Sequence, residues 1–357
     1  MSATPAAGAG QAVSPIDWEF AVRVGARTSK AQPEVSAAEA AGAVADLRAG
    51  AARAAELVND WCELGGEVGQ APLQVVDREG WIRANTQTFS ALLEPAVSKL
   101  LTRTPGSRLV RTVGSRAAGA EMGALLGFLG SRVLGQFDPF HGEHGRLLLV
   151  APNVVQAERD LDVDPDVFRL WVCLHEEAHR VQFTSVPWLR DHVRGLVEEV
   201  TSQVDATHVS PEAIARAVET IRGTGEGPSA GLAAAFASPA QLELLERVTG
   251  VMSLLEGHAD VAMDAVGDLA IDPAAVRSVR RKFNERRKGV STLDRLTRRL
   301  LGLEAKAAQY RDGYRFVQAV TDSVGKSGFN AVFTSPDTLP SKAEILDPPA
   351  WVRRVHG

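Results

Sequence analysis

Hydrophobic and polar positions follow a helical period along most of the chain. An Ala-rich segment over residues 36–64 carries this period, and Glu39 follows Ser36 by three residues, as in a capping box at a helix start. The same spacing predicts further helices over residues 81–101, 119–135, 187–204, 211–222, 241–263, 277–288 and 303–324. A break of the pattern at Gly250 is left open. The chain is therefore expected to be mainly α-helical.

One short apolar run stands apart from the helical pattern. Residues Arg146–Val150 contain three consecutive leucines, and the turn residues Pro152 and Asn153 follow. This run predicts a β-strand, the clearest in the chain. The expected fold class is mainly α with a small β-sheet.

Three glycines recur every fourth residue within the predicted helix over residues 119–135. They are Gly119, Gly123 and Gly127, and they lie beside several large apolar residues. The segment is too short for a membrane span and contains Glu121. We expect these glycines to let another backbone approach this helix closely.

A further helix start is marked by Asp164, a capping residue, and by Pro165 at the first helical position. Helical spacing continues to about Phe183, and the second half of the segment reads His175-Glu176-Glu177-Ala178-His179. This sequence fits the H-E-x-x-H pattern inside a helix, which is the context that the pattern requires.

The spacing of the two histidines predicts a zinc site. His175 and His179 differ by only ~40° around a helix of 3.6 residues per turn, so one ion can accept both imidazoles. Glu176 lies ~100° from His175 and can act as a base toward a water at the metal. A solvent-facing helix with scattered polar residues would explain the match by chance, but apolar residues flank the motif on both sides, as in a core helix.

A third protein ligand is needed if water is to keep the fourth zinc position, and Glu256 is the best candidate. It shares a helical stripe with Met252 and Met263, so its carboxylate projects from an apolar face and needs a cation. Asp260, one turn later, is expected to accept the second ring N–H of a ligating histidine. His258 competes for the ligand role, but it lies ~200° from Glu256 around the helix.

The pair Glu256 and Asp260 resembles the second zinc-binding helix of the gluzincins, the thermolysin-like peptidases. A longer resemblance is to an actinobacterial group of zincin-like metallopeptidases that is often labelled as associated with deazaflavin coenzyme biosynthesis. It is carried by residues 76–78, 135–138, 150–153, the HEEAH helix, residues 255–260, residues 306–313 and Leu339-Pro340. The resemblance implies a zincin-like fold with an active-site helix and a second metal-binding helix, and it implies peptidase chemistry.

Two further expectations concern the substrate. Zincins commonly place an edge strand above the active-site helix, and residues 147–150 are either that strand or a plain core strand. Tyr310 and Tyr314 are the two tyrosines of the chain and lie one helical turn apart. Tyr310 falls in the family-like motif and is a candidate donor to the transition state, with ordinary packing as the alternative.

The overall composition is that of an ordinary globular protein. The 357 residues are 45% hydrophobic and 23% charged, with a formal net charge of -5, so no global charge attracts nucleic acid or an anionic membrane. The N-terminal residues lack a secretory signal pattern, no apolar stretch approaches the ~20 residues of a membrane span, and a cytoplasmic protein is expected. Cys62 and Cys173 lie far apart among apolar neighbours and are expected to be buried free thiols.

The strongest local charge feature is a basic segment over residues 277–299. It contains acidic Glu285 and Asp294 and only one aromatic residue, Phe283. A solvated helix face is therefore expected rather than a nucleic-acid interface, and docking of a protein partner or an acidic substrate stays open.

The sequence thus predicts a zinc metallopeptidase that acts on a peptide or protein substrate through a water activated by zinc and deprotonated by Glu176. A non-catalytic zincin scaffold that binds a partner and a metal-dependent amidohydrolase on a non-peptide substrate are the alternatives. The expected organisation is a disordered segment 1–15, a helical region 16–145, a catalytic region 146–329 and a packed tail 330–357. Glycine-rich residues 223–227 are a candidate lid.

Overall fold

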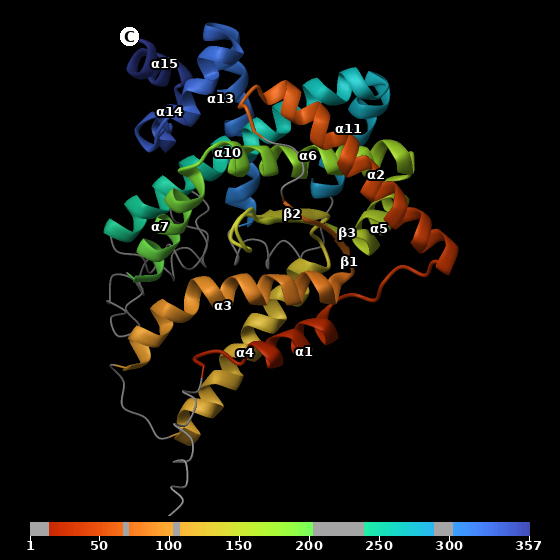
Figure 1. Ribbon diagram of the computed structural model, residues 1–357, viewed down its shortest axis with the longest axis vertical. Helices are drawn as coiled ribbons and strands as arrows, with labels where there is room; N and C mark the ends of the chain where they lie inside the picture. The colour runs from red at the N-terminus through yellow and green to blue at the C-terminus, as the bar shows by residue number, and fades with distance from the viewer. Residues whose placement is uncertain (1–13, 67–70, 103–107, 203–238, 289–302) are drawn as a thin grey trace, which may run out of the picture. The chain divides into compact units, whose positions relative to one another are not determined.

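The computed structural model describes residues 14–66, 71–102, 108–202, 239–288 and 303–357, which form mostly helices and one small sheet (Figure 1). These residues divide into two compact units, one within Met1–Gln32 and Asp77–Val133, the other within Pro33–Val76 and Leu134–Gly357. None of the described helices combines the length and the apolar composition that a membrane crossing needs. The expected division near residues 145 and 329 stays a prediction.

The first unit contains helices α1 (Trp18–Thr28), α3 (Arg78–Thr102) and α4 (Arg108–Gly130). The glycines of α4 lie against α1, as expected. A Cβ atom at Gly123 would lie 2.4 Å from the carbonyl oxygen of Ala21, and one at Gly127 would lie 2.6 Å from that of Gly25. Glycine is therefore required for the close packing of these two helices.

The second unit holds the remaining elements. Its larger helices are α2 (Ala37–Cys62), α5 (Ala151–Leu161), α6 (Pro165–Ser185), α7 (Leu189–Ser202), α10 (Pro239–Ala270), α11 (Pro273–Lys288) and α13 (Leu303–Phe329). The predicted capping box at Ser36 is present, since Ser36 Oγ accepts from the Glu39 N–H and Glu39 Oε2 accepts from the Ser36 N–H. The helix α10 continues through Gly250, so no break occurs there. The predicted helix over residues 211–222 and the candidate lid lie outside the described residues.

The sheet has three strands, β1 (Leu73–Val76), β2 (Gly135–Asp138) and β3 (Arg146–Val150), in the order β1-β3-β2. The predicted strand is β3, which is buried along its whole length and pairs parallel with β1 and antiparallel with β2. Of the two predictions for residues 147–150, the plain core strand is confirmed and the edge strand is wrong, because both sides of β3 are hydrogen-bonded to neighbours. The edge strand that contacts α6 is β2.

The helix α6 runs through the middle of the second unit, where it packs against α2, α10 and β2 (Figure 1). One apolar cluster surrounds it, with fully buried side chains such as Leu47, Phe168 and Leu174. This packing explains why the helix is apolar on both sides of its polar motif.

The helices α10 and α13 touch through their backbones. A Cβ atom at Gly257 would lie 2.2 Å from the carbonyl carbon of Gly313, and one at Gly313 would lie 1.9 Å from the carbonyl oxygen of Ser253. Two glycines facing each other therefore permit a helix contact without intervening side chains.

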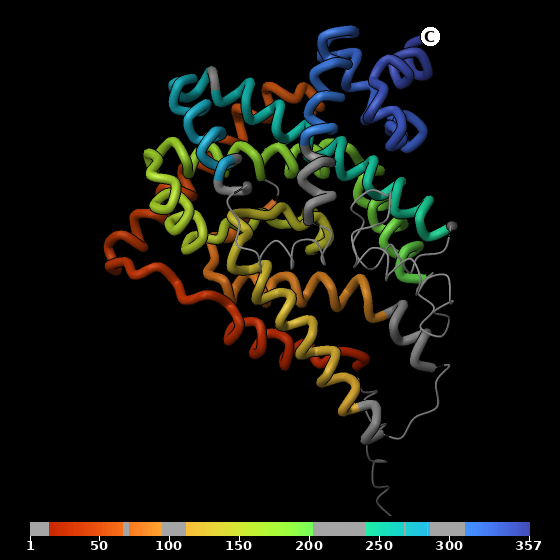
Figure 2. The backbone as a smooth tube through the Cα atoms, turned by 180° about the vertical axis from the view of Figure 1, so that it is seen from behind, coloured from red at the N-terminus to blue at the C-terminus, as the bar shows by residue number. Residues whose placement is uncertain are grey.

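The C-terminal tail consists of two 3-10 turns, η1 (Asn330–Phe333) and η2 (Pro336–Thr338), and the helices α14 (Lys342–Leu346) and α15 (Pro348–His356). Figure 2 shows α14 and α15 beside α13, which they contact. Trp351 is fully buried in a second apolar cluster with Phe316, and its ring N–H donates to the Thr338 carbonyl. The tail therefore contributes to the core and does more than cover the surface.

Candidate metal centre

The centre is built first on α6. Asp164 caps this helix by accepting from the N–H groups of Asp166 and Val167, and the helix then continues unbroken through His175 and His179. The two imidazole rings lie edge to face, with centroids 4.9 Å apart and planes at 88°. The predicted pairing of the two histidines on one helix face is thus present.

The third predicted ligand, Glu256, reaches the same point from α10. Its Oε2 atom lies 3.5 Å from Nε2 of His175 and 3.5 Å from Nε2 of His179. The three potential ligand atoms lie within 4.8 Å of one another, and among the described residues these side chains form the group that could hold a metal ion.

The donor set fits a divalent cation. Glu256 is 9% exposed, and its Oε2 atom is buried without a hydrogen-bond partner among the described residues. Two imidazole nitrogens and one carboxylate oxygen are ordinary zinc ligands, and ligands ~2.1 Å from a tetrahedral zinc lie ~3.4 Å apart. The two 3.5 Å separations are close to this value and longer than the ~3.0 Å of a usual N–H···O hydrogen bond, so they are compatible with ligands around an ion.

Electrostatics at this point favour positive charge. Burial alone would raise the pKa of Glu256, but the adjacent His179 and His175 hold it well below the usual range of a carboxyl group. Burial would lower the pKa of His179, yet the Glu256 carboxylate beside it raises this pKa to about 9. The carboxylate is therefore negative and stabilises a cation next to it.

Glu176 lies on α6 beside the edge strand β2. Burial raises its pKa, while the neighbouring histidines and a hydrogen bond from the Phe137 backbone oppose this rise. A Cβ atom at Gly135 would lie 2.5 Å from Cγ of Glu176, so the strand passes this close because it has glycine there. The carboxylate is held between the helix and the strand.

Asp260 lies one turn beyond Glu256, as the sequence predicted. Its Oδ1 atom is 3.8 Å from Nδ1 of His175 and 3.7 Å from a guanidinium nitrogen of Arg280 on α11. Arg280 also pairs with Asp264, which in turn accepts a 3.1 Å hydrogen bond from the Tyr314 hydroxyl. A chain of charged and polar groups thus runs from the metal centre to a neighbouring pocket.

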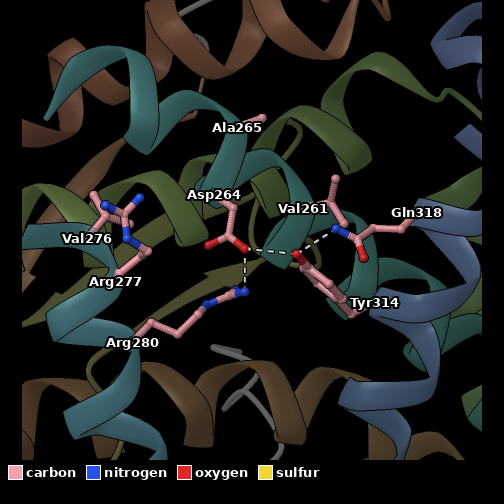
Figure 3. Close-up of a pocket in the computed structure, with 8 residues that line it drawn as sticks. All are labelled: Val261, Asp264, Ala265, Val276, Arg277, Arg280, Tyr314 and Gln318. Atoms are coloured by element: carbon pink, nitrogen blue, oxygen red, sulfur yellow. Dashed lines mark hydrogen bonds and ion pairs between the residues drawn. The ribbon is translucent and has the colours of Figure 1, made fainter. Parts of the chain in front are cut away.

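Figure 3 shows this pocket, whose cavity volume is about 330 Å³. Its polar lining includes Asp264, Arg280, Tyr314 and Gln318, with Gln318 donating to the Tyr314 hydroxyl at 2.7 Å. Arg280 stacks over the Tyr314 ring with its guanidinium carbon 5.2 Å from the ring centroid. These contacts hold Arg280 beside Asp260, whose Oδ1 atom also lies near His175.

His258, the competing ligand candidate, does not lie with Glu256 and the two histidines of α6. Its Nδ1 atom is 3.0 Å from Nε2 of Gln182, and its ring lies among Trp61, Phe329 and Phe333 at centroid distances of 5.3–5.6 Å. Burial lowers the pKa of His258 to about 3, so the ring is neutral. The helical angle between positions 256 and 258 explains why one side chain faces the centre and the other does not.

The remaining predictions concern Tyr310, the basic segment and the two cysteines. Tyr310 belongs to α13, but its side chain lies outside the described part, and its role stays a prediction. Residues 289–302 of the basic segment also lie outside it. Cys62 and Cys173 are buried free thiols, as expected, and burial raises the pKa of the Cys62 thiol to about 12.

Three residues near the centre were not singled out by sequence reasoning. Gln182 follows His179 by three positions and so shares its helix face, a signal that could have identified it. Arg280 was assigned only to a solvated basic face. Gly135 appeared only within a family-like motif, and its fit against Glu176 depends on strand pairing that the local sequence does not reveal.

Comparison with known proteins places this geometry in a family. Residues 16–352 match the family described as Zincin-like metallopeptidase. The structure is also similar to a crystal structure from Chloroflexus aurantiacus described as "a putative hydrolase with a novel fold", with a TM-score of 0.69 and 27% sequence identity over 96% of this chain and 99% of that chain. No curated protein sequence gives a significant match. The actinobacterial and deazaflavin associations stay predictions.

Proposed function

Since this chain belongs to the zincin-like metallopeptidase family, we propose that it is a zinc-dependent peptidase with the metal held by His175, His179 and Glu256. The family and the hydrolase neighbour support a metal-dependent hydrolase. Zinc as the ion and the peptide bond as the target are the additional steps of this proposal.

The observation that carries the proposal is the buried Oε2 atom of Glu256, which lies equidistant from two imidazole nitrogens and lacks a hydrogen-bond partner among the described residues. A carboxylate in this position is costly unless a cation compensates it. Zinc suits two imidazoles and a carboxylate and leaves one position open in a tetrahedral arrangement.

When bound, zinc supplies Lewis acidity that activates water and polarises a carbonyl group. Glu176 then serves as the general base, because its carboxylate lies one residue from His175 and is held at the centre by α6 and β2. It takes the proton from the attacking water on a carboxylate oxygen and passes that proton to the leaving amine. Its buried position raises its pKa and so makes it a stronger base.

The edge strand β2 supports a peptide as the substrate. Strand β3 occupies one side of β2, and Glu176 lies against Gly135 and Phe137 of the same strand. An extended peptide that pairs with a sheet edge presents its carbonyl groups along that edge. We therefore propose β2 as the strand along which a peptide substrate binds, in place of the edge-strand alternative for residues 147–150.

The test is Glu176→Gln, with zinc content measured by inductively coupled plasma mass spectrometry and cleavage measured on a peptide library. We expect about one zinc per chain in both proteins, and turnover reduced by at least about a thousandfold in the variant because it lacks a base. Cleavage by Glu176→Gln at the wild-type rate would refute the role of Glu176. Wild-type protein that binds zinc yet cleaves no peptide would favour a non-peptide amide or a binding scaffold.

A further inference from the structure

A single buried amide connects the two helices that carry the metal-binding side chains. Gln182 is fully buried on α6, one turn after His179. Its Oε1 atom lies 3.0 Å from Nδ1 of His179. Its Nε2 atom lies 2.8 Å from the carbonyl oxygen of Leu255 and 3.0 Å from Nδ1 of His258, both on α10.

The orientation of this amide follows from its partner at Leu255. A backbone carbonyl only accepts hydrogen bonds, so the Gln182 atom facing it must be the NH₂ group. The amide oxygen must then face His179, and an oxygen can only accept from the ring. Nδ1 of His179 therefore carries the hydrogen.

This assignment decides which nitrogen of His179 can bind a metal. A neutral imidazole has one N–H and one lone pair, and a hydrogen on Nδ1 leaves the lone pair on Nε2. Nε2 is the atom that lies 3.5 Å from Glu256 Oε2. The amide of Gln182 thus holds the ligating nitrogen in its metal-binding form.

The second hydrogen of the Gln182 amide is also used. His258 accepts it at Nδ1 and is itself held among Trp61, Phe329 and Phe333. Since every polar atom of the buried Gln182 amide is paired, its orientation is fixed on both sides. The contact at Leu255 also ties α6 to the residue that precedes Glu256.

We propose that Gln182 is a positioning residue of the metal centre: it fixes the tautomer of His179 and holds Glu256 in register with the two histidines. This inference rests on the metal site of the proposed function. Residues of this kind, which hydrogen-bond the far nitrogen of a histidine ligand, typically change metal affinity by about 10–100-fold when replaced.

Three variants separate the effect of the Gln182 hydrogen bonds from the effect of packing. Gln182→Met keeps the size of the side chain but removes all three hydrogen bonds. Gln182→Glu keeps an acceptor for His179 but loses the amide donor to Leu255 and His258. Val181→Ala is the matched control, since Val181 is a buried neighbour on α6 that packs in the apolar cluster and has no polar group.

The zinc dissociation constant of each purified full-length protein would be measured by competition with a chromophoric chelator. We expect Gln182→Met to raise the zinc Kd about 10–100-fold and Val181→Ala to leave it within about threefold of wild type. Gln182→Glu should bind zinc more tightly than Gln182→Met. Nitrogen-15 spectra of labelled histidine should show His179 with its hydrogen on Nδ1 in the zinc-loaded wild type.

The outcomes distinguish failure of the positioning role of Gln182 from failure of the proposed metal site. A wild-type protein that does not bind zinc refutes the metal site itself. Zinc binding by wild type with an unchanged Kd in Gln182→Met refutes the positioning role alone, and so does an equal loss in Gln182→Glu and Gln182→Met. A similar loss in Val181→Ala assigns the effect to packing and also overturns the inference.

Discussion

At the scale of single residues, the centre depends on atoms that are placed by what surrounds them. Glu176 and Glu177 are adjacent acids on one helix, yet they have different environments. Glu177 pairs with Arg180 on α6, whereas Glu176 lies between the histidines and β2. The position of each carboxylate, rather than its chemistry, therefore makes only Glu176 available as a base.

Gly135 is expected to control the placement of this base. In Gly135→Ala the new Cβ would lie 2.5 Å from Cγ of Glu176, so either the strand or the carboxylate must shift. We expect kcat/KM for peptide cleavage to fall about 10–100-fold with zinc content unchanged, because small displacements of a reacting group are costly. Steady-state kinetics and metal analysis would check this.

Gly195→Ala is the control for that experiment. Gly195 lies within α7, and a Cβ atom there meets nothing within 4 Å. We expect unchanged kinetics and a gain of about 0.5–1 kcal/mol in unfolding free energy, since alanine favours the helix. Equal kinetics for Gly135→Ala and wild type would contradict the fit between strand and base.

At the scale of elements, a charged side chain connects the two C-terminal helices, α14 and α15. Glu344 completes a capping box with Ser341 at the start of α14 and pairs with Arg354 of α15. Burial would raise the pKa of Glu344, but the Arg354 and Ser341 hydrogen bonds outweigh burial and lower it. One side chain therefore stabilises both short helices.

This lowered pKa predicts a pH-dependent stability. A carboxyl group whose folded-state pKa lies below its unfolded value adds stability above the unfolded pKa and loses it as the pH falls through the folded one. We expect Glu344→Gln to lower the unfolding free energy by about 1 kcal/mol near pH 7, because the variant keeps a side chain that can complete the capping box but loses the ion pair with Arg354. The difference from wild type should shrink below about pH 4.5.

Thermal denaturation of both proteins between pH 3 and pH 8 would check this prediction. Glu243→Gln, at an exposed position of α10, is the matched control and should track the wild type throughout. A gap between wild type and Glu344→Gln that stays constant down to pH 3 would show that the carboxylate charge is not responsible.

At the scale of the whole molecule, the proposed ion connects α6 with α10 and therefore contributes to folding. A ligand that binds only the folded state stabilises it by about 2.7 kcal/mol at one hundred times its Kd. We expect zinc to raise the Tm of chelator-treated protein by several degrees. In Glu256→Ala this rise should vanish, whereas it should persist in Glu246→Ala, an exposed residue of α10 that pairs with Lys342.

Differential scanning calorimetry with and without zinc would measure these shifts. A full zinc-dependent rise in Glu256→Ala would mean that stabilisation arises from another site. The same outcome would contradict the assignment of Glu256 as the third ligand.

The sequence predicts the elements whose signals are local. The capping box at Ser36, the start of α6 at Asp164 and the pairing of His175 with His179 each depend on residues within one or two helical turns. The placement of Glu256 was also anticipated, because a lone carboxylate on an apolar stripe is a local signal.

The features that the sequence did not predict depend on contacts between distant segments. Strands β1 and β2 are only four residues long and contain polar residues, so they are recognisable only through their pairing with β3. The same pairing makes β3 central rather than an edge. At Gly250, where α10 continues, a Cβ would lie 3.0 Å from the Pro340 carbonyl oxygen, so glycine lets the helix lie close to the tail.

The facing glycines of α10 and α13 restrict how this chain can evolve. Any mutation that gives Gly257 a side chain puts an atom 2.2 Å from the Gly313 backbone, which forces the helices apart. Because Gly257 directly follows Glu256, the same movement displaces the proposed ligand. Neither glycine can therefore gain a side chain alone, and the proposed metal centre constrains α13 through the spacing of the two backbones at Gly313, a residue without a side chain.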